Sequence, residues 1–255
     1  MDQTAPTSSP TPPQKLYKFR AIETKEDWRR LRSILLKYEL YCPSPISFND
    51  PFDCRTPPLG DIEPVFARYL ICPSNQSQST EPLTPSENCE LRQTLAKAQE
   101  RINSSGVLSL AASRDSTLMW SHYARDHRGI ALEFDTTEWC SHMPYMAQHF
   151  FPVLYSEQRI NLNLTRREYD NAQFFKSTIL TKDHCWESEQ EWRIIQSKPS
   201  PLKFPPSALT GIIFGCRTPE RKKMKLRKMC KKLSGVTWHQ SETRMKQFGL
   251  DIKQY

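Results

Sequence analysis

Glycine is scarce in this chain, with only seven residues in 255. The phosphate loops of nucleotide-binding proteins need closely spaced glycines, because only a residue without a side chain lets the backbone approach a phosphate group. The sequence contains no such loop, no HExxH zinc motif and no G-x-S-x-G nucleophile turn. These absences exclude the commonest nucleotide hydrolases, metalloproteases and serine hydrolases.

Long apolar runs are also missing. No stretch approaches the roughly 18 consecutive apolar residues that a membrane helix needs. The opening residues, MDQTAPTSSPTPPQ, lack the basic and apolar regions of a secretory signal peptide. We therefore expect a cytoplasmic protein without a membrane partner, and a chain that is 37% apolar can bury a sizeable core.

The eight cysteines lack any metal-binding spacing. They are scattered along the chain, with no CxxC pair and no histidine at a zinc-ligand distance. The spacing of zinc deaminases is missing too, because no cysteine lies three residues from Cys185. We expect reduced, mostly buried thiols and no metal site.

The net charge of +8 is confined to one segment. Residues 217–232 carry nine basic residues and one acidic residue, so the rest of the chain, with 27 of each sign, sums to zero. Proline at the start and apolar residues at the spacing of one helical face predict a helix from Pro219 to Leu233. The alternative to a binding role is a solvated helix face. The candidate contacts to nucleic-acid phosphates are Lys222, Lys223, Arg227 and Lys228.

Composition divides the chain into few parts. Residues 1–14 are rich in proline, serine and threonine without apolar periodicity, which predicts a disordered tail. Residues 15–255 are expected to form a single domain with a polar surface insertion around residues 73–88. The sequence has no sustained internal repeat.

Apolar periodicity predicts an α+β fold. Residues 16–20 alternate like a strand, and Thr24 with Asp27 forms a capping box before a helix. The proline-rich segment 39–55 is expected to be an ordered loop. Further strands are predicted at 106–112, 129–134, 151–155, 191–196 and 209–214, and further helices at 89–102 and 118–125. Strands and helices do not alternate regularly, which disfavours a doubly wound sheet.

Glu189 and Glu191, in the segment WESEQEWRII, form the most conspicuous acidic pair. Residues two apart in a strand project from the same face, so the two carboxylates are expected side by side at the start of a strand. Like charges at that distance raise one pKa, which suits a general base or a group that holds a substrate hydroxyl. The alternative is a chance pair in a surface strand.

A second candidate region, SRDSTLMWSHYARDHRG, combines aromatic and polar side chains. Trp120, His122 and Tyr123 can stack on a planar ligand and orient it. Helical spacing from Met119 to Tyr123 equally suits core packing, with His122 as a structural histidine.

Two further pairs of residues are candidates for ligand binding. Asn49 and Asp50 precede a proline, where their side chains either bond their own backbone in a turn or face a ligand. Lys18 and Arg20 in the first strand can pair with phosphate oxygens, although exposed strands commonly carry cations.

From residue 16 to about residue 233, the order of motifs resembles a largely bacterial family of uncharacterised domains. The motifs are LYKFR, SFNDPFD, LMWSHYARDHRGIALEFD, WESEQEWRI and IIFG. The family is known by its FNDPFD, MWxHYAxxHxG and ExEWR series, of the type called domain of unknown function 2971.

More distantly, the layout resembles ADP-ribosyltransferases, particularly those that modify DNA bases. This resemblance implies split antiparallel sheets with flanking helices and NAD as a substrate. It implies that Lys18 or Arg20 contacts NAD and that Tyr123 occupies the middle aromatic position. It also implies that Glu191 stabilises an oxocarbenium-like transition state, with Glu189 helping to activate the acceptor. The chain departs from toxin-type relatives in lacking their Ser-Thr-Ser motif.

The resulting hypothesis is an ADP-ribosyltransferase-like enzyme that uses NAD to modify a macromolecular acceptor, with nucleic acid as a candidate acceptor and defence or stress response as the context. The alternative is a non-catalytic module that binds nucleic acid or another protein. The first hypothesis depends on Glu191, whereas nucleic-acid binding by a module depends on the basic helix.

Overall fold

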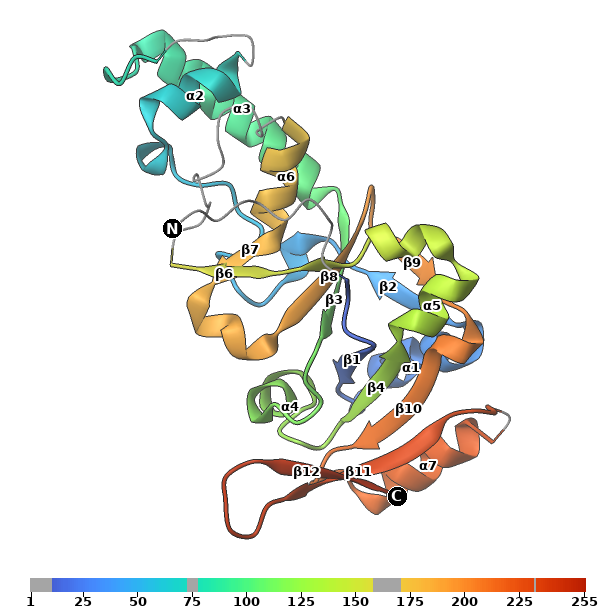
Figure 1. Ribbon diagram of the computed structural model, residues 1–255. Coiled ribbons are helices and arrows are strands. Elements are labelled where there is room, and N and C mark those ends of the chain that lie inside the picture. The colour runs from blue at the N-terminus through green and yellow to red at the C-terminus, as the bar shows by residue number, and fades with distance from the viewer. Residues whose placement is uncertain (1–10, 73–77, 158–170, 232) are drawn as a thin grey trace.

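A computed structural model describes residues 11–72, 78–157, 171–231 and 233–255. It has a mixed α+β architecture around an eight-stranded sheet (Figure 1), which confirms the predicted fold class. The strands lie in the order β12 (Leu250–Gln254), β11 (Thr237–Thr243), β10 (Leu209–Phe214), β4 (Ile130–Asp135), β1 (Lys15–Arg20), β3 (Gly106–Ala111), β8 (Glu191–Gln196) and β5 (Phe151–Pro152). Neighbouring strands are antiparallel except β10 and β11, which are parallel.

Two short sheets and seven helices complete the described part of the chain. Strand β2 (Glu39–Cys42) pairs with β9 (Ser200–Lys203), and β6 (Leu154–Ser156) pairs with β7 (Thr181–Asp183). The helices are α1 (Lys25–Lys37), α2 (Pro64–Ile71), α3 (Pro85–Asn103), α4 (Thr117–Tyr123), α5 (Thr136–His142), α6 (Asn171–Leu180) and α7 (Glu220–Met229). Short 3-10 turns include η1 (Pro45–Ser47) and η4 (His184–Glu189).

Local sequence signals located several elements correctly. Strands β8 and β10 have the predicted bounds, and α1 begins with the predicted capping box between Thr24 and Asp27. Helix α1 buries Leu31, Ile34 and Leu35, each worth about 1.5–3 kcal/mol when fully removed from water.

Other boundaries differ from the prediction. The segment expected to be only a loop contains β2, because Glu39–Cys42 pairs with a strand 160 residues later in the chain. Helix α3 begins at Pro85 rather than at residue 89, since Thr84 and Glu87 form a second capping box. Helix α7 ends at Met229, four residues before the predicted end.

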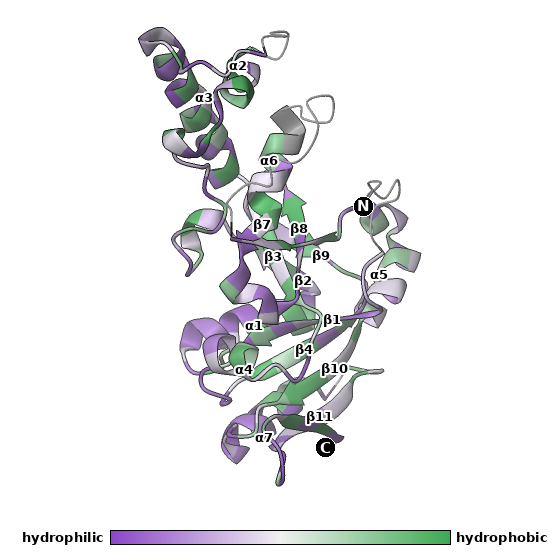
Figure 2. Ribbon diagram, turned by 60° about the vertical axis from the view of Figure 1, so that its left-hand side comes forward, coloured by the Kyte–Doolittle hydropathy of each residue, from purple (hydrophilic) through white to green (hydrophobic). Residues whose placement is uncertain are grey.

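The eight-stranded sheet has an apolar core on each face. Leu16 of β1 packs with the buried side of α1 and with Trp139 of α5, whereas Tyr17 and Phe19 face Met119 and Trp120 of α4. Figure 2 shows the green, hydrophobic colouring of the central strands and the purple patches on α7. A separate core joins α2, α3 and α6, which lie together at one end of the molecule in Figure 1.

The predicted tail and insertion are described only in part. Residues 1–10 and 73–77 lie outside the described residues. The carbonyl groups of Pro13 and Gln14 accept hydrogen bonds from the Thr136 side chain and backbone, at 2.7 and 2.9 Å. Beyond residue 77, the nearly buried Arg68 donates hydrogen bonds to the carbonyl groups of Ser79 and Glu81.

Strand β1 parts from β3 within the large sheet. It pairs with β4 along its whole length, from Lys15 opposite Asp135 to Arg20 opposite Ile130, but with β3 only where Tyr17 lies opposite Ala111. Ala111 in turn lies opposite Glu191 at the start of β8. The end of β8 with the predicted carboxylate therefore lies beside the point where the sheet opens.

Candidate active cleft

A cleft of about 1540 Å³ opens where β1 parts from β3. Its walls come from β1 and β3, from one side of α1, and from β2, η1 and α4. Seven residues that the sequence analysis singled out line it: Lys18, Arg20, Asn49, His122, Tyr123, Glu189 and Glu191. The fold thus gathers candidates from four distant segments in one cavity.

Glu191 is held by two cations. Arg193, two residues further along β8, donates two hydrogen bonds to its carboxylate at 2.8 and 3.0 Å. Lys182 of β7 donates a third at 3.1 Å. The backbone amide of Glu191 donates to the Tyr155 hydroxyl at 2.7 Å. Side chain and backbone of Glu191 are therefore both fixed, and the side chain is almost fully buried.

Glu189 shares Lys182 with Glu191. Its carboxylate accepts a hydrogen bond from the Tyr123 hydroxyl at 2.7 Å and a second, short one from the Lys182 ammonium group. Glu189 ends the η4 turn, and Gln190 has a left-handed φ of 46°, so the two carboxylates meet through a turn and not through strand alternation. They are neighbours, as expected, but for a different reason.

The pKa of Glu191 moves in the direction opposite to the one expected from its acidic neighbour. Burial disfavours the charged form, but Arg193 and Lys182 outweigh burial and lower the pKa to about 2. For Glu191, the two cations therefore outweigh the rise in pKa that a neighbouring carboxylate is expected to cause. Burial and Glu189 do raise the pKa of Tyr123.

Arg193 binds two of the carboxylates near the cleft, those of Glu191 and Asp53. Its guanidinium is fully buried and forms a bidentate pair with Asp53 at 2.6 and 2.9 Å, besides its bonds to Glu191. It also donates to the carbonyl oxygen of Ile179. Charge-assisted, bidentate pairs of this kind are strong and fix orientation. The cluster therefore contains three carboxylates and two cations, with a formal charge of −1.

The first strand contributes two cations to the cleft. The Lys18 ammonium donates a hydrogen bond to the carbonyl oxygen of Ser109 at 2.6 Å, across the opening between β1 and β3. Burial and the adjacent Arg20 lower the pKa of Lys18 to about 7. The buried Nε of Arg20 has no hydrogen-bond partner among the described residues.

One side of α1 forms a cationic wall. Arg29, Arg30 and Lys37 line the cleft, with Glu26 bound to both arginines at 2.7 and 2.8 Å. Tyr41 of β2, which is half exposed, lies in the lining as well. The cleft therefore has carboxylates at the β8 end and cations along α1 and β1.

Two predicted site residues lie outside the cleft lining. Trp120 is fully buried; its ring packs edge-on against Phe19, and its indole donates to the carbonyl of Arg114 at 2.9 Å. Asp50 accepts a hydrogen bond from the Phe52 amide at 2.8 Å, as in the turn that was the alternative interpretation. The neighbouring Asn49 lines the cleft, 3.5 Å from the Tyr123 hydroxyl.

His122 lines the cleft between two aromatic rings. Its ring lies 5.9 Å from Trp186 and 6.3 Å from Tyr123, in edge-to-face geometry. The rings of His122, Tyr123 and Trp186 therefore form an aromatic group, and its Tyr123 hydroxyl donates a hydrogen bond to Glu189.

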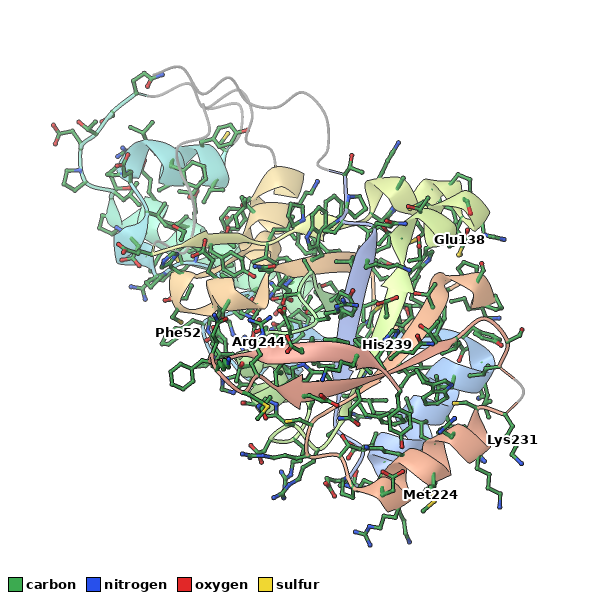
Figure 3. All side chains as sticks on the ribbon, turned by 60° about the horizontal axis from the view of Figure 1, so that its bottom comes forward. Phe52, Glu138, Met224, Lys231, His239 and Arg244 are labelled. Atoms are coloured by element: carbon green, nitrogen blue, oxygen red, sulfur yellow. The ribbon has the colours of Figure 1, made fainter. Side chains whose placement is uncertain are left out.

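The basic residues of α7 have partners within the protein. Lys222 is nearly buried and pairs with Glu23, while Lys223 lies 4.9 Å from the Tyr255 ring centre and Arg227 lies 5.4 Å from the same centre. Lys228 and Lys231 are exposed, and Figure 3 shows Lys231 and Met224 projecting away from the body of the protein. Of the four candidate nucleic-acid contacts, Lys222, Lys223 and Arg227 therefore have partners within the protein, whereas Lys228 is exposed.

Sequence reasoning missed three members of the cluster. Arg193 follows Glu191 by two residues in a predicted strand, so the same alternation argument could have placed it on the same face. Asp53 stands within the SFNDPFD motif, but nothing local shows its partner. Lys182 carried no signal, because its two carboxylate partners meet it only through the η4 turn.

All eight cysteines are free thiols, as predicted, but they are not mostly buried. Three are buried, namely Cys42, Cys54 and Cys230, and Cys72, Cys89 and Cys185 are exposed. Within the described residues, no group of three or more histidine, cysteine, aspartate or glutamate side chains is arranged to hold a metal ion. No helix in this part of the chain combines the length and apolarity needed to cross a membrane.

Residues 119–194 match the family model described as protein of unknown function (DUF2971). The match confirms the resemblance to a family of uncharacterised domains, and it includes Tyr123, Lys182, Glu189, Glu191 and Arg193. The chain matches no curated protein and no solved structure.

Proposed function

Starting from a family match that assigns no function, we propose that this protein is an ADP-ribosyltransferase-like enzyme that binds NAD in the cleft between β1 and β3. In this proposal, Glu191 stabilises the oxocarbenium-like transition state as the bond between ribose and nicotinamide breaks. The nicotinamide leaves with the bonding electrons. A nucleophilic atom of the acceptor forms the new bond to the ribose carbon and gives up its proton to Glu189.

The observation that carries the proposal is the convergence of three predicted positions. Lys18 and Arg20 on β1, Tyr123 on α4 and Glu191 on β8 were assigned from distant motifs, and all of them line one cavity. The opening of the sheet beside Glu191 is in keeping with the expected split-sheet arrangement. The eight strands are nevertheless joined in one sheet rather than in two separate ones.

The distribution of charge suits NAD. Arg20 and the cations of α1 line the cleft and offer charged donors to a pyrophosphate group. At the other end, Tyr123 and His122 offer rings for the planar nicotinamide, beside a cluster with a formal charge of −1. A ligand with anionic phosphates and a cationic ring is complementary to both ends.

The low pKa of Glu191 supports a particular role for this residue. A general base works best with a pKa near the working pH, whereas a fixed negative charge must stay ionised throughout. A pKa of about 2 fits the second role. Glu189, whose carboxylate is shared by Tyr123 and Lys182, is the proposed partner that activates the acceptor.

We propose nucleic acid as the first acceptor class to test. The cleft, at about 1540 Å³, exceeds the roughly 300–1000 Å³ of ordinary ligand pockets and leaves room for part of a second molecule. The exposed cations of α7 can supply contacts to a phosphate backbone outside the cleft.

The test is nicotinamide release from NAD by the purified protein, with DNA, RNA and protein mixtures as acceptors. We expect wild-type protein to release nicotinamide and Glu191→Gln to lose at least about 100-fold in rate, the order found when a charge-stabilising group is removed. Glu138→Gln on α5, whose side chain is about half exposed, is the matched control and should keep full activity. Circular dichroism shows whether each variant is folded at the assay temperature. Full activity in folded Glu191→Gln would refute the proposal.

The alternative is a non-catalytic module that binds nucleic acid or a protein partner. The exposed Lys228 and Lys231 favour a nucleic-acid contact. Nucleic-acid binding that depends on these cations, with no NAD binding measurable by calorimetry, would support that alternative.

A further inference from the structure

Lys182 occupies the centre of the carboxylate cluster. Its ammonium group contacts Glu189, lies 3.1 Å from Glu191 and 3.9 Å from Asp53, and is almost fully buried. The Trp186 ring lies 4.9 Å from the same nitrogen. Lys182 also lines the cleft, so it belongs to the site and not only to the core.

We propose that Lys182 is the positioning residue of the cleft, whose ammonium group ties Glu189 to Glu191 and holds both carboxylates where the sheet opens. The contact itself does not depend on the proposed reaction, whereas its importance for catalysis does. Holding the pair together would keep the acceptor-activating group and the fixed charge on the same side of the bound ribose.

Arg193 cannot perform this task alone. It binds Glu191 and Asp53, but among the described residues it forms no hydrogen bond or salt bridge with Glu189. Among the described residues, Lys182 alone forms salt bridges with both Glu189 and Glu191. Because Gln190 between them is in a left-handed turn, the strand geometry of β8 does not hold Glu189 in place.

The positioning role of Lys182 can be measured through its effect on the charge of the cluster. With Lys182, the cluster of Asp53, Glu189, Glu191 and Arg193 has a formal charge of −1. Without Lys182, the remaining four residues have a formal charge of −2. The added repulsion, together with the loss of a cation that binds Glu191, favours protonation of Glu191 and raises its apparent pKa. The other titratable groups that face or influence the pair are Lys18, Cys54, Tyr123 and Tyr155, from β1, the loop after η1, α4 and β6.

The experiment is a carbon-13 NMR titration of the glutamate carboxyl groups in wild type and Lys182→Met. We expect the apparent pKa of Glu191 to rise by at least about one unit in the variant. Lys15→Met is the matched control, because Lys15 also bridges two carboxylates, Glu133 at 3.4 Å and Asp135 at 3.1 Å, outside the cleft lining. The control should leave the titration of Glu191 unchanged. An unchanged titration in Lys182→Met would overturn the proposal.

Lys182→Arg keeps the test decisive if the methionine variant does not fold. It retains the charge, so Glu191 should titrate as in wild type. The planar guanidinium places its donors differently, so we expect kcat for NAD cleavage to fall at least about tenfold while KM stays the same. If Lys182→Arg had the same kcat as the wild type, the proposed positioning role of Lys182 would be refuted. A shifted titration in Lys182→Met together with no NAD cleavage by wild type would refute the proposed reaction and leave the positioning role intact.

Discussion

Glu191 carries a charge that the fold fixes before any ligand arrives. Arg193 and Lys182 engage its carboxylate, and Tyr155 engages its amide. Removing one member of a buried charge cluster leaves its partners uncompensated, which is costlier than losing a surface pair. The site therefore couples the stability of the protein to the chemistry we propose.

This coupling predicts how acid affects the wild-type protein and Glu191→Gln. Because the folded pKa of Glu191, about 2, lies below its usual value of 4.5, the carboxylate stabilises the fold above pH 4.5. That contribution is lost as the pH falls from 4.5 through 2. We expect Glu191→Gln to lower the free energy of unfolding at pH 7 by about 3 kcal/mol and to show a smaller deficit at pH 3.

Urea unfolding at both pH values measures the difference. Glu138→Gln again serves as the control, since its side chain is about half exposed and it should follow the wild-type curve. A deficit of the same size at pH 7 and pH 3 would contradict the assigned pKa.

Helix α1 connects a local sequence signal to the cleft. The Thr24 hydroxyl accepts a hydrogen bond from the Asp27 amide, and the Asp27 carboxylate accepts one from the Thr24 amide. This capping box fixes the first turn, whose Glu26 pairs with Arg29 and Arg30 of the next turn in the cleft lining. The cap and the cationic wall therefore belong to the same element.

We predict that Thr24→Ala costs about 1 kcal/mol and lowers Tm by about 2–4 °C, because the helix loses a cap. It should also weaken NAD binding severalfold, since the first turn frays. Thr84→Ala removes the equivalent cap of α3, which does not line the cleft, and should cost similar stability without changing NAD binding. Thermal unfolding and calorimetric titration measure the two effects. If both variants bound NAD with the same affinity, the capping box of α1 would have no specific role in NAD binding.

At the scale of the whole molecule, the excess positive charge lies at the end of the sheet with β10, β11 and α7 (Figure 1). Part of it stabilises the fold, since Lys222 pairs with Glu23 and Lys223 and Arg227 lie on aromatic rings. Charge reversal of these three residues would therefore disturb folding together with any binding. The exposed Lys228 and Lys231 allow a cleaner test.

We expect Lys228→Glu with Lys231→Glu to weaken binding to single-stranded nucleic acid and to reduce the slope of log affinity against log salt by about 2. The free energy of unfolding should stay within about 0.5 kcal/mol, as for other surface substitutions. Lys97→Glu, an exposed change of the same charge on α3, is the control. Fluorescence anisotropy at several salt concentrations gives the slopes. If Lys97→Glu reduced the slope by as much per reversed charge, a specific role for Lys228 and Lys231 would be refuted.

The sequence by itself determined the features that depend on neighbours a few residues away. The strand bounds of β8 and β10, the cap of α1 and the α+β class follow from periodicity and from hydrogen bonds within one turn. It also identified Tyr123, Glu189 and Glu191 as candidate site residues, from their type and motif. Trp120 was ambiguous, because one helical spacing suits both a core side chain and a ligand contact.

Only the tertiary structure decided which distant residues complete the charge cluster of the site. Asp53 and Arg193 are 140 residues apart, and their pairing depends on how the sheet places β8 beside the loop after η1. The same holds for the pairing of β2 with β9 and for the aromatic partners of α7. Glu191 has a low pKa because Arg193 of its own strand and Lys182 of β7 both bind its carboxylate and outweigh the effect of burial. Charges interact through space, so their balance follows from the fold and not from their spacing along the chain.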